Sequence, residues 1–150
     1  MSNFRSTIAA CILFACSTSL ALAGGLKKYV VLPEGYQPNP NATLGLHVGD
    51  TLYISGTTGG DLKTRKYPDV FEDEVKQCMA KIGDFLHADK MDYSDVVSVQ
   101  VYLTDISLFQ RMNAVYNTYF KTPPPSRTTV QIAKLGAPDA HIEITVTARR

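Results

Sequence analysis

The sequence predicts an α+β fold in which a mixed β-sheet carries two helices on one face. Two segments repeat apolar residues every three or four positions, as amphipathic helices do, and several others alternate apolar with polar residues, as half-buried strands do. They follow in the order strand, two strands, helix, strand, helix, two strands. A chain of 150 residues has the length of one domain, and a sheet with helices on one face buries these apolar stripes.

Residues 1–23 have the pattern of a secretory signal peptide. A short start with one positive charge precedes an apolar run from Ile8 to Leu22, and Ala21-Leu22-Ala23 is a small-residue cleavage site. The run is about 15 residues long, whereas a membrane-spanning helix needs roughly 20. Cleavage as a lipoprotein before Cys16 is the alternative. We therefore expect an exported protein, periplasmic or secreted, whose residues 24–150 form a single domain with no membrane attachment after cleavage.

Removal of residues 1–23 leaves a chain without net charge. The whole chain has 15 Lys and Arg against 14 Asp and Glu, and Arg5 is the only one of these in the leader. Binding to nucleic acid or to an anionic membrane surface depends on clustered positive charge, so we expect neither partner. Cys11 and Cys16 also leave with the leader, so Cys78 has no partner for an intrachain disulfide.

The first half of the mature chain predicts three strands and one long helix. Leu26 to Leu32 is a strand, and residues 44–48 and 51–55 form a hairpin. A polar loop then leads into a helix from Val70 to Asp89. Because Cys78 lies on its apolar stripe, we expect this thiol to be packed in the core and not to act as a nucleophile. The stripe recurs at helical spacing: Phe71, Val75, Cys78, Met79, Ile82, Phe85 and Leu86.

The second half predicts a strand, a second helix and two further strands. Residues 95–104 alternate apolar with polar side chains. A Ser-x-x-Gln capping box opens a helix from Ser107 to Phe120. The run Pro123-Pro124-Pro125 cannot donate to a sheet ladder, so the next strand covers Arg127 to Leu135. The last strand runs from His141 to Arg149.

Arg127 and Glu143 are the candidate site residues that this pattern leaves. The proline run places Arg127 at the start of a strand. The guanidinium of Arg127 is planar and permanently charged, so it can bind a carboxylate or phosphate through two parallel hydrogen bonds. Their strands follow each other, so we expect a hairpin with both side chains on the polar face. The pattern fits either a cross-strand ion pair or an arginine that anchors a substrate carboxylate beside a glutamate that handles water.

The sequence offers little support for other kinds of site. His141 and Glu143 place two possible metal ligands on one strand face, but nothing supplies a third at a recognisable spacing. The sequence has no nucleophile elbow, P-loop or dinucleotide-binding glycine pattern. We therefore expect neither a metal site nor an organic cofactor.

From about Leu44 to Arg150, the chain resembles the Rid/YjgF family of reactive intermediate (enamine/imine) deaminases. The resemblance implies a chorismate-mutase-like α+β fold and a homotrimer with its sheets around a central barrel and its clefts between subunits. Such an assembly would cover the sheet face that no helix protects. The matching stretches are Gly49-Asp50-Thr51-Leu52-Tyr53-Ile54-Ser55-Gly56, Val101-Tyr102-Leu103-Thr104-Asp105, Met112-Asn113-Ala114-Val115-Tyr116-Asn117-Thr118-Tyr119-Phe120, and Pro125-Ser126-Arg127 onward to Ile142-Glu143-Ile144.

The resemblance implies a role for each matching site residue. Arg127 matches the family arginine that binds the substrate carboxylate, and Glu143 matches the glutamate that positions or activates water. Ser55 and Gly56 match the segment that lines the same cleft, and Asn113 matches a helix asparagine near it. The implied reaction is cofactor-free hydrolysis of a 2-imino or enamino acid to a 2-oxo acid and ammonia.

Two positions depart from the family pattern. Thr129 stands where the family commonly has a cysteine, and we keep it as a candidate substrate-binding residue. Ala42, in a proline-rich loop, stands where the family has a tyrosine. The retained Arg127 favours hydrolysis, whereas the two replacements leave the identity of the substrate undetermined. The alternatives to an enzyme are a module that binds a small carboxylate without turnover and a structural trimer.

Overall fold

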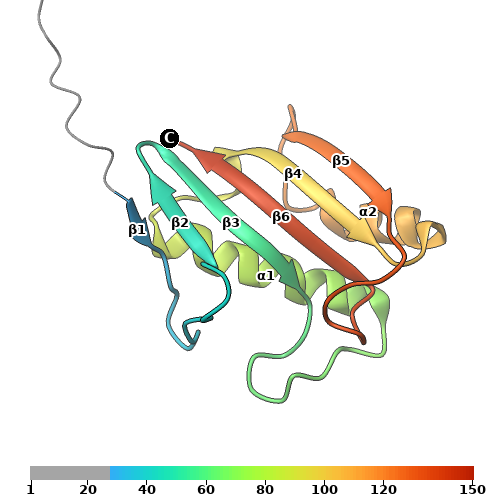
Figure 1. The fold of residues 1–150 in the computed structure, drawn as a ribbon. Coiled ribbons are helices and arrows are strands. Elements are labelled where there is room, and N and C mark those ends of the chain that lie inside the picture. Colours follow the sequence, from blue (N-terminus) through green and yellow to red (C-terminus); the bar gives the residue numbers. More distant parts are fainter. Residues whose placement is uncertain (1–27) are drawn as a thin grey trace, which may run out of the picture.

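The fold of residues 28–150, shown by a computed structural model, is one mixed β-sheet covered on one face by two helices (Figure 1). The leader expected over residues 1–23 lies outside the described part of the chain. The strands follow the order β1-β2-β3-β6-β4-β5 across the sheet. The elements are β1 (Lys28–Val30), β2 (Gly45–Val48), β3 (Thr51–Thr58), α1 (Phe71–Ala88), β4 (Val96–Leu103), α2 (Phe109–Tyr116), β5 (Ser126–Gln131) and β6 (Ile142–Arg149).

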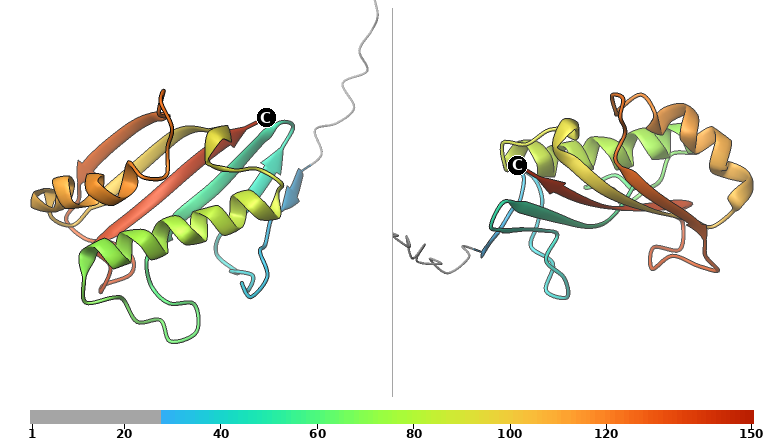
Figure 2. Two further views of the ribbon diagram at one scale, coloured as in Figure 1. Left: turned by 180° about the vertical axis from the view of Figure 1, so that it is seen from behind. Right: turned by 90° about the horizontal axis from the view of Figure 1, so that it is seen from above.

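The predicted α+β class with both helices on one face is confirmed. Figure 2 shows α1 and α2 side by side above the sheet, and no helix of residues 28–150 lies on the opposite face. That open face carries Tyr53 and Val130, whose side chains are 50% and 40% exposed. Among the described helices, neither is long and apolar enough to cross a membrane.

Strand β5 lies at the edge of the sheet and pairs with β4 in parallel, so the predicted hairpin between the strands of Arg127 and Glu143 is wrong. Arg127 lies opposite Val99 of β4, and Glu143 lies opposite Tyr102 on the other side of the same strand. The reason is the crossover through α2, which returns the chain in the same direction as β4. The last strand, β6, then fills the centre of the sheet between β3 and β4.

The bounds of α2 and β5 also differ from those predicted. Helix α2 begins at Phe109, after a short 3₁₀ turn over Ile106–Leu108, and ends at Tyr116. The predicted Ser107 cap of this helix is absent, because the residue before α2 is Leu108, which makes no side-chain cap hydrogen bond. Asp105 caps the 3₁₀ turn instead, and its carboxylate accepts a hydrogen bond from the Ser107 amide at 2.8 Å. Strand β5 ends at Gln131, four residues before the predicted end.

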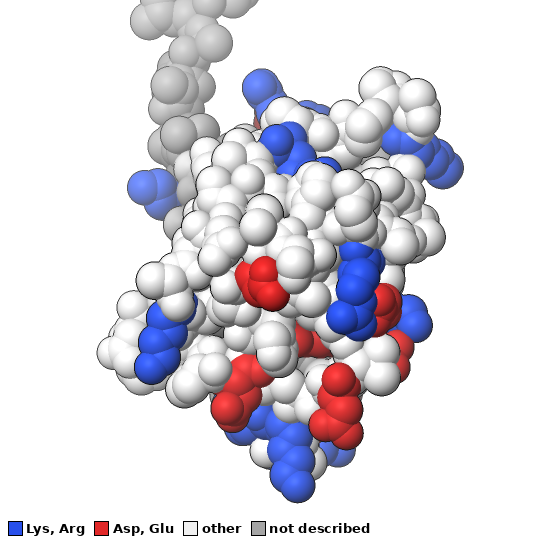
Figure 3. Space-filling view, turned by 90° about the vertical axis from the view of Figure 1, so that its right-hand side faces the viewer, with Lys and Arg blue, Asp and Glu red and all other residues white. Residues whose placement is uncertain are grey.

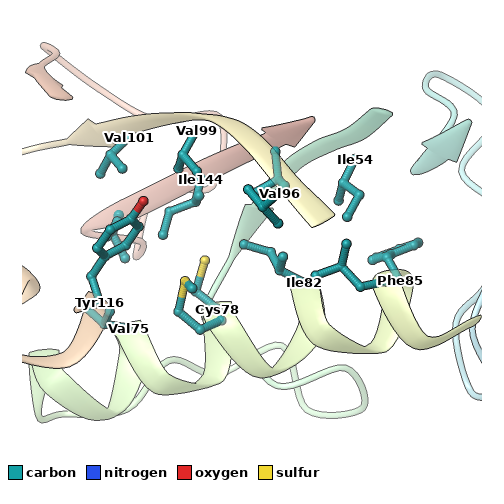
Figure 4. Packing of buried hydrophobic residues seen from close by; sticks show 14 of the residues in the cluster. Ile54, Val75, Cys78, Ile82, Phe85, Val96, Val99, Val101, Tyr116 and Ile144 are labelled. Atoms are coloured by element: carbon teal, nitrogen blue, oxygen red, sulfur yellow. The ribbon is translucent and has the colours of Figure 1, made fainter. Parts of the chain in front are cut away.

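The core lies between α1 and the sheet. Side chains from α1, such as Val75 and Ile82, point at Ile54 and Ile144 of the central strands (Figure 4). Cys78 is fully buried, and its thiol donates to the carbonyl oxygen of Thr57 at 3.0 Å. Burial raises the pKa of this thiol, so it stays protonated and unreactive at neutral pH. The prediction that Cys78 packs in the core is confirmed.

The two helices are joined at the surface by a two-pronged ion pair. Arg111 donates from Nε and a terminal nitrogen to the two carboxylate oxygens of Glu72, at 2.7 and 2.6 Å. The guanidinium lowers the pKa of Glu72 to about 2. Because this pKa is depressed, the pair stabilises the fold above the ordinary carboxyl pKa, and this contribution is lost as the pH falls from about 4.5 toward about 2.

We expect Arg111→Gln to return the pKa of Glu72 toward its ordinary range, because the charged hydrogen bonds that favour the ionised form are lost. An NMR titration of the Glu72 carboxyl carbon measures this shift directly. Arg149→Gln removes an exposed guanidinium on β6 without touching the pair and serves as the matched control. An unchanged Glu72 titration in Arg111→Gln would contradict the assignment.

Candidate functional site

The candidate site residues fall into two groups on opposite faces of the sheet. Arg127 and Thr129 lie opposite Val99 and Val101, whose side chains are buried under the helices. Glu143 alternates with the buried Ile142 and Ile144, so its side chain lies on the open face. The prediction that Arg127 and Glu143 share one polar face is therefore wrong. We call the first set, with Asn113 and Tyr116 of α2, the arginine group, and Glu143 with Ser55 and Gly56 the glutamate group.

Aromatic rings of α2 hold the guanidinium of Arg127 in the arginine group. Its central carbon lies 4.6 Å from the ring centre of Tyr116 and 5.6 Å from that of Phe109. Within residues 28–150, no carboxylate forms an ion pair with Arg127, so the alternative of a cross-strand pair with Glu143 does not hold in this chain. Stacking leaves the hydrogen-bonding edge of the guanidinium available to a carboxylate.

Three buried polar atoms of the arginine group lack partners. In the described part of the chain, no hydrogen bond is made by Asn113 Oδ1, the Tyr116 hydroxyl or Thr129 Oγ1. A buried polar group without a partner costs about 1–3 kcal/mol, so native proteins keep few of them. Burial raises the pKa of Tyr116, which keeps its hydroxyl protonated and able to donate. The hydroxyls of Tyr116 and Thr129 can donate to a small carboxylate beside the charged fork of Arg127, whereas Asn113 Oδ1 can only accept a hydrogen bond.

Tyr116 joins this group although it was not among the predicted site residues. It lies three positions after Asn113, which places both side chains on one helix face. Its spacing of three residues from Asn113, a predicted site residue, is the sequence signal that could have identified Tyr116.

A bulge in β3 creates the glutamate group. The pairing of β3 with β6 shifts between Ile54 and Thr57, so Ser55 and Gly56 stand out of register. A Cβ atom at Gly56 would overlap the carboxylate of Glu143, so the acid rests directly on this glycine. Ser55 donates from Oγ to the carbonyl oxygen of Thr43 at 2.6 Å and thereby ties the bulge to the loop before β2.

A buried carboxylate on α1 fixes the start of β6. Glu74 accepts hydrogen bonds from the backbone amides of His141 and Ile142, at 2.8 and 3.3 Å, and lies 2.8 Å from His141 Nδ1. These contacts position the strand two residues before Glu143. His141 therefore belongs to a structural contact, and within residues 28–150 no three His, Cys, Asp or Glu side chains gather to hold a metal ion. The sequence did not indicate Glu74, because it lies among the acids of the first helical turn.

A cavity of about 190 Å³ adjoins the bulge at the edge of β3. Its lining includes the candidate residues Ser55 and Gly56, and α1 contributes Lys81 and Phe85. Ala42 lies exposed in the neighbouring loop, where its methyl group offers no hydrogen bond. The loop position where the family pattern has a tyrosine thus contributes no polar group here.

The comparisons with known proteins agree with this architecture. Residues 38–150 match the family model described as Endoribonuclease L-PSP. A RutC family protein of Saccharolobus solfataricus is 36% identical, over 83% of this chain and 99% of that protein. The 2-iminobutanoate/2-iminopropanoate deaminase of Bos taurus is also 36% identical, over 69% of this chain and 74% of that protein.

A solved structure of a relative places the fold in the same group. The crystal structure of RidA from the Antarctic bacterium Psychrobacter sp. is 28% identical, aligns with a TM-score of 0.71, and covers 83% of this chain and 98% of that one. The predicted YjgF-like fold is confirmed. The chain therefore belongs to the Endoribonuclease L-PSP family, which is the Rid/YjgF family that its sequence resembles.

Proposed function

We propose that this protein hydrolyses reactive 2-imino and enamino acids to 2-oxo acids and ammonia. The observation that carries the proposal is the arginine group. Within residues 28–150, no carboxylate pairs with Arg127 in this group, and three of its buried polar atoms make no hydrogen bond. The relatives named as 2-iminobutanoate/2-iminopropanoate deaminases support the same chemistry. Glu143 and Gly56 stand at the positions that the family resemblance assigns to the same reaction.

The active site is completed by a second copy of the chain. The arginine group and the glutamate group lie on opposite faces of one sheet, so a substrate of a few atoms cannot touch both within one copy. The open face, with exposed Tyr53 and Val130, offers a surface for self-association. A closed homotrimer supplies one arginine group and one glutamate group at each of its interfaces.

In this site, Arg127 binds the substrate carboxylate and withdraws charge from the neighbouring imine carbon. Glu143 holds a water and accepts a proton from it as the oxygen bonds to that carbon. The carboxyl group then returns the proton to the nitrogen. Glu143 next accepts the hydroxyl proton and passes it to the same nitrogen. The C–N bond then breaks, the nitrogen leaves as ammonia with the electron pair, and the oxygen becomes the carbonyl of the 2-oxo acid. The steps balance without a metal or an organic cofactor.

The charge distribution supports a small-molecule substrate over RNA, which the family description names. Acidic and basic side chains are interspersed on the face in Figure 3, whereas nucleic-acid binding uses continuous basic surfaces. The leader-like residues 1–23 support a site of action outside the cytoplasm, in the periplasm or the medium.

Imine trapping by semicarbazide tests the proposal. An amino-acid oxidase generates the imine in the presence of purified residues 24–150, and semicarbazide captures the fraction that survives. We expect less semicarbazone with the wild-type protein than with Arg127→Ala, whose circular dichroism should stay unchanged because this side chain is outside the apolar core. Equal trapping across several side chains, together with thermal stabilisation by 2-oxo acids, would instead identify a binding module without turnover.

A further inference from the structure

The cavity beside the bulge contains two cationic side chains that the proposed reaction does not use. Strand β2 pairs with β3 only from Thr51 to Ile54, so the edge of β3 beyond Ile54 is free of a neighbouring strand there. The cavity opens along this edge. Because Ser55 and Gly56 belong both to its lining and to the glutamate group, the cavity adjoins the proposed active site.

Lys81 reaches the cavity from α1. Its ammonium group donates to the carbonyl oxygens of Thr58, at 3.0 Å, and of Gly60. An ammonium group has three donors, so one remains after these two bonds. Burial and the neighbouring Arg65 lower the pKa of Lys81, and an anion in the cavity would oppose both effects.

Arg65 reaches the cavity from the loop between β3 and α1. Within residues 28–150, neither Arg65 nor Lys81 forms an ion pair. Asp61, in the same loop, accepts hydrogen bonds from the amides of Lys63 and Thr64, at 3.0 and 2.7 Å, and its charge also acts on Lys81 without an ion pair between them. Asp61 is not part of the cavity lining. Among the described residues, the cavity thus holds two cations that no carboxylate contacts as an ion pair, which favours an anionic guest.

The rest of the lining limits the shape of that guest. Tyr36, Leu44 and Phe85 form an apolar wall, and the hydroxyl of Tyr36 donates to Asp84 at 3.1 Å. The volume of about 190 Å³ restricts the guest to a small molecule. A guest that fits this cavity has a short side chain. Its methylene groups contact the apolar wall, and its terminal carboxylate lies beside the two cations.

We propose that the preferred substrates are 2-imino dicarboxylates, with the side-chain carboxylate bound by Lys81 and Arg65. This inference rests on the proposed function and names its substrate class. Water adds at the imine carbon as before, and the products are a 2-oxo dicarboxylic acid and ammonia. The reaction that supplies such a substrate is an oxidation or elimination that leaves an imine on an acidic amino acid.

The test compares the imines of glutamate and glutamine, which differ only in the charge of the side-chain end. Suitable oxidases generate both, and trapping gives the ratio of kcat/KM for the two substrates. We expect a ratio above one for the wild type and a fall of roughly tenfold or more in Arg65→Gln, because a charged hydrogen bond is lost. Lys66→Gln removes a charge from the same loop outside the cavity, so its ratio should match the wild type.

The outcomes separate this inference from the proposed function. Hydrolysis of both imines with equal efficiency, or a ratio that Arg65→Gln leaves unaltered, overturns the substrate class while the hydrolase stands. If neither imine is hydrolysed, the proposed reaction fails. Thermal shifts with 2-oxoglutarate and 2-oxobutanoate then show whether the cavity binds a second carboxylate. A larger shift with the dicarboxylate that Arg65→Gln abolishes supports the cationic subsite, and equal shifts overturn it.

Discussion

Equal mixing of Arg127→Ala and Glu143→Gln chains is expected to restore about a quarter of wild-type hydrolysis, although each variant alone is inactive. Each proposed site takes its arginine group from one copy and its glutamate group from the next. With random assembly, half of the copies carry an intact Arg127 and half carry an intact Glu143. About one interface in four therefore joins the two intact groups.

The mixing experiment needs exchange of subunits, by co-expression or by unfolding and refolding the two variants together. The control mixes wild-type chains with the double variant Arg127→Ala/Glu143→Gln under the same treatment. A site shared between copies leaves about a quarter of the activity in this control, whereas a site within one chain leaves about half. Failure of the two inactive variants to complement each other would disprove the shared site.

The fold class and the long helix α1 were predictable because their signals are local and redundant. Seven apolar residues at helical spacing define the buried stripe of α1, and each alternating strand identifies its own buried face. Cys78 was placed correctly for the same reason.

The order of the strands was not predictable from these local patterns. Alternation gives the two faces of a strand but not its neighbour, so the strands of Arg127 and Glu143 were expected to pair. Val130 lies on the open face, although an apolar residue in an alternating strand usually marks the buried face. An edge strand can carry apolar residues outward where a second copy of the chain covers them.

The candidate site was predictable as a set of residues but not as two separate groups. The helix-covered side of the sheet carries Arg127, Thr129 and Asn113, whereas the glutamate group combines Glu143 with Ser55 and Gly56. This division follows from the crossover through α2 and the bulge in β3. Glu74 escaped notice because a charged residue in a first helical turn is usually solvated, whereas here its carboxylate replaces water as the acceptor for the first amides of β6.

Gly56→Ala is expected to lower kcat roughly 100-fold, which is the lower end of what a general base contributes. The new methyl group would occupy the space of the Glu143 carboxylate, so the acid must turn away from its water. Gly136→Ala is the matched control, because a Cβ there meets nothing within 4 Å. Neither glycine has a positive φ, so alanine is compatible with both backbones.

The second step of this experiment shortens the acid. In Gly56→Ala/Glu143→Asp, the carboxylate is drawn back by one methylene group, which relieves the overlap with the new methyl group. We expect this double variant to be more active than Gly56→Ala alone, whereas simple damage to β3 would not be repaired by a change on β6. Steady-state kinetics and thermal midpoints of the variants separate the two effects. Wild-type kcat in Gly56→Ala would show that Glu143 does not act from this position.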